Sequence, residues 1–506
     1  MKKILFFAAF VAAVTIITCT TSNNQPSGKD TGAEKSDADA GRTPSVVSLV
    51  QSTTVSQASA FTYADILSLT REAITLAGGL NDIIKTGNTV VLKPNVITTV
   101  WNWGISGGSV AELVNGVCTD RRVIQAVAQI VREIIGPTGK ILVIEGSGKG
   151  STTAHFANLG YTKANLVNVD EIIALENEGA WAGVGNASGS DGYVTQVTLD
   201  NFVYNKASGT YLRYYKNDGK YYVNKKMYEA DALICIPVVK NHWNAVVTGA
   251  IKNISIGGAP PRIYGNSNSD IGRNNMVNHA SSNLHDWIVD YFSCIPADFV
   301  VMDGLQGLQN GPLPSVNNNA ALGSHQKNLR CILASKDALA IDVVEANIVG
   351  WDYTTVPYLV KLNEIGQVGS KPNGRVIQLR GNPKDIIVLG NKTIDDIRGN
   401  YAGSMGAGNP GGRISQADQV KPTVTINSAV FSGSTLNLDL SLSNGRHDNV
   451  VKIDVYVDGA YKASFNTGMN NVSFDVQNLS SDSHTVEVRA FTRYMYSATA
   501  HTLANR

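Results

Sequence analysis

Short apolar runs alternate with helix-like segments through the middle of the chain. Two of these segments, 121–135 and 338–349, repeat apolar residues at helical spacing. Runs of strand length lie at 89–92, 140–145, 232–239, 299–302, 331–334 and 385–389. Nearly continuous apolar strands separated by helices are typical of a largely parallel sheet covered by helices on both faces. The pattern therefore predicts an α/β domain over about residues 59–400.

Two other segments depart from this pattern. The Tyr-rich stretch at about 186–228 predicts a meander of strands inserted in the α/β domain, whose tyrosines either line a groove or pair across strands. A Gly-rich linker predicted at 401–420 leads into 421–506, where every second residue is apolar and Asp458-Gly459 is a turn signal. This alternation predicts an antiparallel β-sandwich. Its strings VYVDG and HTVEVRAF resemble bacterial immunoglobulin-like domains, which implies carbohydrate binding or, as the few aromatic candidates favour, a spacer role.

The first eighteen residues have the pattern of a signal peptide, with two lysines followed by an apolar run of about fourteen residues. That run is too short to span a bilayer, which takes roughly 20 residues. Cys19 follows it directly, and this arrangement resembles a bacterial lipoprotein signal, which implies a lipid on Cys19 and attachment to the membrane. Residues 19–58 are mostly small and polar and predict a flexible tether. We therefore expect a lipid-anchored protein of the bacterial cell envelope, facing the periplasm or the exterior, with free secretion as the alternative.

Composition limits the classes of function. The chain of 506 residues has 42 Lys and Arg against 41 Asp and Glu, and removal of Lys2 and Lys3 with the leader leaves 40 against 41. No nucleic-acid partner is expected, because such binders usually carry a clustered basic excess. The five cysteines form no CxxC pair, which excludes local iron–sulfur and zinc-ribbon motifs. We expect Cys235, inside an apolar run, to be a buried core thiol. The sequence does not decide whether Cys294 and Cys331 form a disulfide.

Polar clusters follow five of the predicted strands. In α/β sheets, side chains just past the carboxyl ends of strands are the first candidates for a binding site, although the same residue types are also ordinary turn formers. The clusters are Lys93-Pro94-Asn95, Glu145-Gly146-Ser147-Gly148, Lys240-Asn241-His242, Asp303-Gly304 with Asn310-Gly311-Pro312, and Ser335-Lys336-Asp337.

Two further features favour a site over simple turns. Thr248 and Lys252 are four residues apart in a helix-like stretch, so they face the same way and bring a second cation near Lys240. Asp342 lies inside an apolar helix and needs a partner, which Lys93, Lys240 or a metal could supply; a purely structural ion pair is the alternative. The Gly-rich turn at 145–152 lacks the GxxxxGK[ST] spacing of a phosphate-binding loop.

Five blocks of sequence resemble, in order, the domain of unknown function 362 (DUF362). The resemblance implies that Lys240 with His242, Lys252 with Asn253, Asp303 with Asn310, and Asp337 with Asp342 occupy the motif positions of that family. Many members are joined to ferredoxin-like segments with two four-iron clusters, but this chain has no such run of cysteines, so no iron–sulfur cofactor is expected. The blocks are VVLKPNV (90–96), Thr119-Asp120-Arg121, PVVKNHWNAVVTGAIKNISIGG (237–258), VVMDGLQGLQNGP (300–312) and ILASKDALAIDVVEANIVG (332–350).

The leading hypothesis is an enzyme that acts on a small anionic substrate at the strand ends. His242 is the acid/base candidate because its unperturbed pKa is about 6.5, with Lys240 and Asp303 beside it. Asp337 and Asp342 are the candidates to hold a divalent metal. The alternative is a non-catalytic surface lipoprotein that binds a ligand or carbohydrate. The predicted substrate-binding residues are Lys93, Asn95, Lys252, Asn253 and Asn310.

Overall fold

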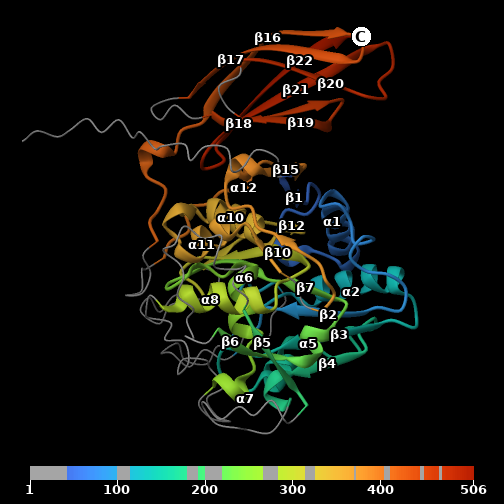
Figure 1. The fold of residues 1–506 in the computed structure, drawn as a ribbon, viewed down its shortest axis with the longest axis vertical. Coiled ribbons are helices and arrows are strands. Elements are labelled where there is room, and N and C mark those ends of the chain that lie inside the picture. Colours follow the sequence, from blue (N-terminus) through green and yellow to red (C-terminus); the bar gives the residue numbers. More distant parts are fainter. Residues whose placement is uncertain are drawn as a thin grey trace, which may run out of the picture. The chain divides into compact units, whose positions relative to one another are not determined.

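The computed structural model shows a large α/β unit and a set of C-terminal β-sheets (Figure 1). The predicted signal peptide 1–18 and Cys19 lie outside the residues that it describes. Among the described residues, no helix is both long and apolar enough to cross a bilayer. The described residues are 43–99, 114–178, 192–199, 219–265, 283–313, 325–369, 372–403, 411–444, 450–466 and 470–506.

The predicted α/β class is confirmed by a central sheet with the strand order β15-β1-β12-β10-β7-β2-β3-β4. Neighbouring strands from β4 to β10 along this order run parallel, and β1 is parallel to β15. β12 is antiparallel to both of its neighbours, β1 and β10. The bounds are β1 (Ser45–Gln51), β2 (Thr89–Pro94), β3 (Lys140–Glu145), β4 (Glu171–Ala174), β7 (Ala232–Ile236), β10 (Phe299–Leu308), β12 (Cys331–Ser335) and β15 (Ile386–Gly390).

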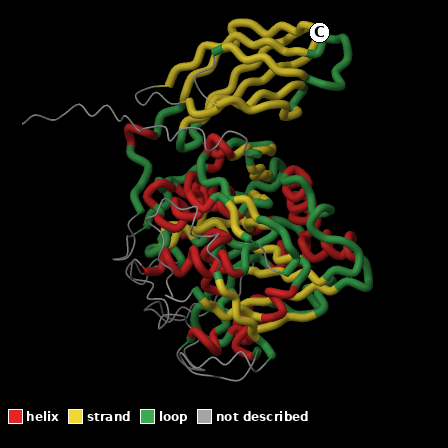
Figure 2. Tube along the Cα trace, viewed as in Figure 1, coloured by secondary structure: helices red, strands yellow, loops and turns green. Residues whose placement is uncertain are grey.

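Helices cover both faces of this sheet, and each face has its own apolar core (Figure 2). The strands supply both cores because successive side chains point to opposite faces: Val90 and Leu92 of β2 join one core and Val91 the other. The first core includes residues of α1 (Tyr63–Leu76), α2 (Arg121–Ile135) and α3 (Thr152–Leu159). The second includes residues of α8 (Asn283–Cys294), α10 (Ala338–Val349) and α11 (Pro357–Ile365).

Local sequence explains where these helices begin. At α1, Thr62 and Asp65 form a reciprocal capping box. Asp120 caps α2 by accepting a hydrogen bond of 2.8 Å from the backbone N–H of Arg122, and Asp337 caps α10 in the same way. The predicted helices 121–135 and 338–349 are confirmed to the residue.

The α/β unit begins earlier than predicted, because β1 lies within the range that we expected to be tether. Its side chains enter both cores, with Val47 and Leu49 on one face of the sheet and Val50 on the other. Its seven residues are too few to show a periodic pattern beside a polar leader, and its burial comes from distant strands. At the other end, Tyr401 and Ile414, both inside the predicted linker, are buried.

The apolar run at 232–239 is two strands rather than one. Pro237 separates β7 from β8 (Val238–His242), since proline has no N–H to donate to the ladder. β8 then pairs with the far part of β10 and with β9 (Val246–Val247). Because of this break, Lys240 and His242 lie on β8, beyond the carboxyl end of β7.

The C-terminal residues form two antiparallel sheets, with the orders β16-β17-β20 and β19-β18-β21-β22. Alternating apolar residues from both sheets build one core, as the period-two pattern predicts. Within the Tyr-rich stretch, β5 (Val194–Thr198) and β6 (Lys220–Asn224) form an antiparallel pair. The bounds are β16 (Pro422–Ser432), β17 (Thr435–Asn444), β18 (Val450–Val457), β19 (Ala460–Asn466), β20 (Asn471–Asp475), β21 (Ser483–Thr492) and β22 (Ser497–Asn505).

We expect Gly249→Ala to destabilise the protein by about 2–3 kcal/mol, through backbone strain and overpacking. Gly249 has a φ of +52°, and a Cβ there would lie 2.6 Å from Asp342 Oδ1. Gly433→Ala is the matched control, because Gly433 has a φ of +62° but nothing within 4 Å of its Cβ position. Urea unfolding of both variants measures the difference. Equal losses would mean that the Asp342 carboxyl moves aside freely.

Candidate functional site

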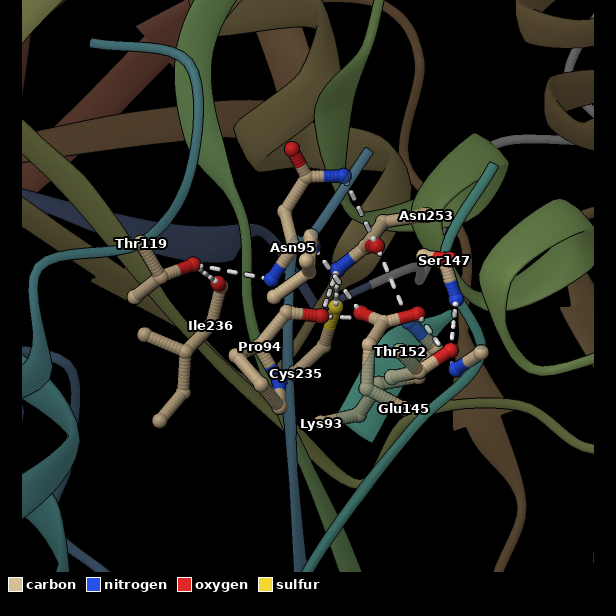
Figure 3. Close-up of polar contacts among 12 residues, drawn as sticks. Lys93, Pro94, Asn95, Thr119, Glu145, Ser147, Thr152, Cys235, Ile236 and Asn253 are labelled. Carbon is tan, nitrogen blue, oxygen red and sulfur yellow. Dashed lines mark hydrogen bonds and ion pairs between the residues drawn. The ribbon is translucent and has the colours of Figure 1, made fainter. Parts of the chain in front are cut away.

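A buried ion pair joins the ends of β2 and β3. Lys93 Nζ lies 2.8 Å from Glu145 Oε2, and both side chains are essentially inaccessible to solvent (Figure 3). Lys93 also donates to Asn253 Oδ1 at 3.0 Å and to the Pro94 carbonyl at 3.1 Å. The backbone passes close over the pair at Gly257, where a Cβ would lie 2.7 Å from Lys93 Nζ. Glycine is therefore required there.

Two asparagines link this pair to a second buried lysine. Asn95 donates through Nδ2 to Asn253 Oδ1 at 3.1 Å and accepts a hydrogen bond of 2.6 Å from Lys240 Nζ on its own Oδ1. Lys240 also donates to the Val117 carbonyl. The backbone of Asn95 is fixed by Thr119, whose hydroxyl accepts from the Asn95 N–H at 2.8 Å and donates to the Ile236 carbonyl (Figure 3). The predicted residues Lys93, Asn95, Lys240 and Asn253 thus form one network.

Lys252 is the third lysine of this cluster and differs from the other two. It ends α6 (Gly249–Lys252), directly before the π-helical turn Asn253–Gly257. No hydrogen bond or ion pair holds its ammonium group among the described residues. It is 5% exposed, whereas Lys93 and Lys240 are 0% exposed, so solvent reaches Lys252 alone of the three.

The cluster carries more positive than negative charge. Burial lowers the pKa of Lys252 to about 7, and the charges of Lys240 and Lys93 lower it further. Burial also lowers the pKa of Lys240 to about 8. Glu145 is already paired with Lys93. Burial and the nearby Asp342 raise the pKa of Glu345 well above its ordinary value.

His242 lies on the same face of β8 as Lys240, two residues farther along. Its Nδ1 accepts hydrogen bonds from the backbone N–H groups of Asn244 at 3.1 Å and Ala245 at 3.2 Å. A ring nitrogen that accepts carries no proton, so the neutral ring has its proton on Nε2. Opposite His242, the β-branched Val246 has a φ of +70°, and strained residues of this kind gather at functional sites.

Asp303, a predicted catalytic residue, lies beside Asp120. It accepts hydrogen bonds from the backbone N–H groups of Asp120 at 2.9 Å and Leu305 at 3.0 Å. Burial and the charge of Asp120 raise its pKa to about 7. The charge of Arg122 acts in the opposite direction and lowers this pKa. Asp303 thus belongs to a neighbouring carboxyl pair, which the chain from Asp120 to Thr119 and the pairing of Asp303 with Val238 of β8 link to the lysine network.

The other predicted residues lie apart from the lysines. Asn310 donates its backbone N–H to the Ala402 carbonyl at 2.6 Å, and its side chain meets His325 Nδ1 at 3.3 Å. Asp337 caps α10 and also accepts from Ser45 Oγ at 2.6 Å. Neither side chain contacts the lysine network among the described residues.

The Asp342 carboxyl pairs with backbone N–H groups, whereas the sequence left Lys93, Lys240, a metal or a structural ion pair open as its partner. Its two oxygens accept from the N–H groups of Ala250 at 2.6 Å and Ile251 at 3.0 Å, so it holds the turn of α6 that carries Lys252. Among the described residues, no three His, Cys, Asp or Glu side chains gather as a metal site. A metal bound by Asp337 and Asp342 stays a prediction.

Sequence reasoning did not assign a role to Glu145 or Glu345. Glu145 is in one of the strand-end clusters, and its pairing with Lys93 could have been inferred, because neighbouring parallel strands end at the same edge of a sheet and Leu92 is in register with Val143. Glu345 accepts a hydrogen bond of 2.9 Å from the Lys240 N–H. It lies inside a helix rather than at a strand end, so its position in the sequence does not indicate this contact.

The four described cysteines are all buried and free, so Cys294 and Cys331 form no disulfide. Cys235 is a core thiol, as predicted, and burial raises its pKa to about 12. A thiol with so high a pKa is a poor nucleophile.

Several known proteins are similar to this chain. Thylakoid-associated protein sll1697 of Synechocystis sp. is 23% identical over 319 residues, which cover 63% of this chain and 80% of that protein. The lactate racemase apoprotein of Thermoanaerobacterium thermosaccharolyticum is 11% identical, with a TM-score of 0.32. The match covers 66% of this chain and 61% of the racemase chain. The fibronectin(III)-like modules of Clostridium thermocellum CbhA are 15% identical with a TM-score of 0.15, covering 27% of this chain and 56% of theirs.

The match to a protein family covers the whole lysine network. The family model of the domain of unknown function (DUF362) matches residues 90–347, about half of the chain. That span runs from β2 through α10 and contains Lys93, Glu145, Lys240 and Lys252. This chain therefore belongs to the DUF362 family.

Proposed function

We propose that the protein is an enzyme that binds a small anionic substrate at the cluster of Lys93, Lys240 and Lys252. The observation that carries this proposal is Lys252, a nearly buried lysine without a counter-ion among the described residues, beside two other buried lysines. Burying an unpaired charge is costly, so such a group either loses its proton or meets an anion. A carboxylate, phosphate or sulfate group would supply the missing negative charge.

Each lysine has a distinct capacity for this ligand. Lys93 has three hydrogen-bond donors, and Glu145, Asn253 and Pro94 use them, so it contributes mainly charge. Lys240 uses two donors on Asn95 and Val117 and keeps one for a ligand. Lys252 keeps all three, since none of the described residues accepts from it. The asparagine pair holds Lys93 and Lys240 in place, so the ligand meets a preorganised site.

His242 is the proposed acid/base group. Two backbone N–H groups hold its ring with the proton on Nε2, so the neutral imidazole can donate from that atom. Lys240 lies on the same face of β8, two residues before His242, so the cation that orients the anion and the group that moves the proton come from one strand.

Lys252→Met should weaken binding of inorganic phosphate or pyruvate at least tenfold, or about 1.4 kcal/mol. Titration calorimetry between pH 6 and 9 measures the affinity. In the wild type it should fall as the pH rises through about 7 to 8, because Lys252 and then Lys240 lose their protons. Lys336→Met, on an exposed lysine paired with Asp82, is the control and should leave affinity unchanged. Equal affinity in Lys252→Met and wild type would contradict the proposed site.

His242→Ala separates an enzyme from a binding protein. Loss of turnover with anion binding retained would support the acid/base role. Loss of binding, with no turnover by the wild type on any anion tested, would instead favour a ligand-binding protein. The sequence of residues 1–19 supports a place for either protein in the cell envelope, anchored through a lipid on Cys19.

A further inference from the structure

We infer that Lys252 forms an imine with the carbonyl group of an anionic aldehyde or ketone, such as a 2-oxo acid. This inference rests on the proposed anion site and names the class of its substrate. Lys252 is the lysine of the cluster whose ammonium group no described residue engages and which keeps some exposure to solvent. Its two neighbours are fully buried: Lys240 keeps one donor for the anionic group and Lys93 adds positive charge, so they can hold that group while Lys252 reacts.

The surroundings suit a nucleophilic amine rather than a permanent cation. Burial, together with two positive neighbours, lowers the pKa of Lys252 to about 7, so about half of it is neutral at that pH. An exposed lysine with a pKa of about 10.4 has a neutral fraction roughly a thousandfold smaller at pH 7. Cationic neighbours and desolvation are the usual means by which proteins activate a lysine for carbonyl chemistry.

The step is balanced without a further reactant. The neutral amine of Lys252 adds to the carbonyl carbon, and a C–N bond forms while the carbonyl oxygen takes a proton. The oxygen then leaves as water with both hydrogens of the original amine, and a C=N bond remains. Protonation of this imine by solvent gives a positive nitrogen that draws electrons from the adjacent carbon.

The backbone around Lys252 holds the amine in place. Asp342 accepts from the N–H groups of Ala250 and Ile251 in the same turn, and Asn253 binds both Lys93 and Asn95 on the other side. The backbone on both sides of Lys252 is thus held by hydrogen bonds, so its long side chain is the part that can move toward a ligand.

Trapping with sodium cyanoborohydride and pyruvate tests the inference. Reduction of the imine should add to the full-length protein the mass of pyruvate less one oxygen, and peptide mapping should place it on Lys252. Labelling should be at least tenfold faster than on any exposed lysine at pH 7.5, and its rate should rise as the pH increases through about 7. Lys336→Arg should be labelled like the wild type, since Lys336 lies at the surface.

Lys252→Arg separates this inference from the anion site itself. Arginine keeps the charge but forms no such imine, so this variant should bind phosphate within about threefold of wild type and lose the label. Wild-type protein that binds phosphate but is labelled no faster at Lys252 than at exposed lysines would overturn the imine and leave the anion site standing. Loss of phosphate binding by Lys252→Met together with normal labelling of wild type would confirm both.

Discussion

Lys93→Met should lower the free energy of unfolding by about 3–5 kcal/mol, the typical cost of removing one partner from a buried ion pair. Methionine has nearly the length of lysine, so the loss comes from charge and hydrogen bonds rather than from a cavity. The variant leaves Glu145 buried without its cation, and it removes one of the two hydrogen bonds that Asn253 Oδ1 and the Pro94 carbonyl each accept. Urea unfolding of the full chain measures the change.

Two comparisons give this prediction its meaning. Lys336→Met breaks an ion pair with Asp82 of similar length, 2.7 Å, but with side chains 36% and 64% exposed, and should cost under about 1 kcal/mol. The double variant Lys93→Met with Glu145→Gln removes both charges and should recover part of the loss. If Lys93→Met costs no more than Lys336→Met, the Lys93–Glu145 pair does not hold the ends of β2 and β3 together.

The sequence predicted the strands and helices whose patterns are local. The helix 121–135 shows both its apolar spacing and its Asp120 cap within its own residues, so its bounds could be read directly. Strand β1 could not be recognised, because its burial depends on β12 and β15, which lie nearly 300 residues or more away. The continuation of β10 beyond Met302 to Leu308 depends likewise on its pairing with β8 and β11 (Gln326–Lys327).

The site was predicted in part for the same reason. Lys93, Lys240 and Lys252 follow strand ends or a helix turn that the pattern shows, and a parallel sheet gathers such ends at one edge. Which carboxyl compensates which lysine depends on side-chain register across strands, and the sequence does not show it. Asp303 follows a strand end as clearly as Lys93 does, yet its hydrogen bonds join it to Asp120 instead.

Asp303→Asn should remove a large part of the pH dependence of stability between about pH 4 and 7. Burial, with the charge of Asp120, raises the pKa of Asp303 from 3.8 to about 7. The folded protein therefore keeps a proton that the unfolded chain releases above pH 3.8. The contribution of the protonated Asp303 carboxyl to the free energy of unfolding is complete below that pH. It is lost as the pH rises toward 7, by up to about 1.4 kcal/mol per pH unit.

Thermal or urea unfolding of wild type and Asp303→Asn over this range measures the difference. Burial also raises the pKa of Asp337, but that carboxyl is present in both proteins and cancels in the comparison. Asp65→Asn is a control of opposite sign. Hydrogen bonds from Thr62 lower the pKa of Asp65, so its contribution is present above about pH 4 and lost below it. A difference between wild type and Asp303→Asn that stays constant from pH 4 to 7 would mean that Asp303 is already ionised in the folded protein. Arg122, which lies 2.7 Å from Asp120, would then stabilise two adjacent carboxylates.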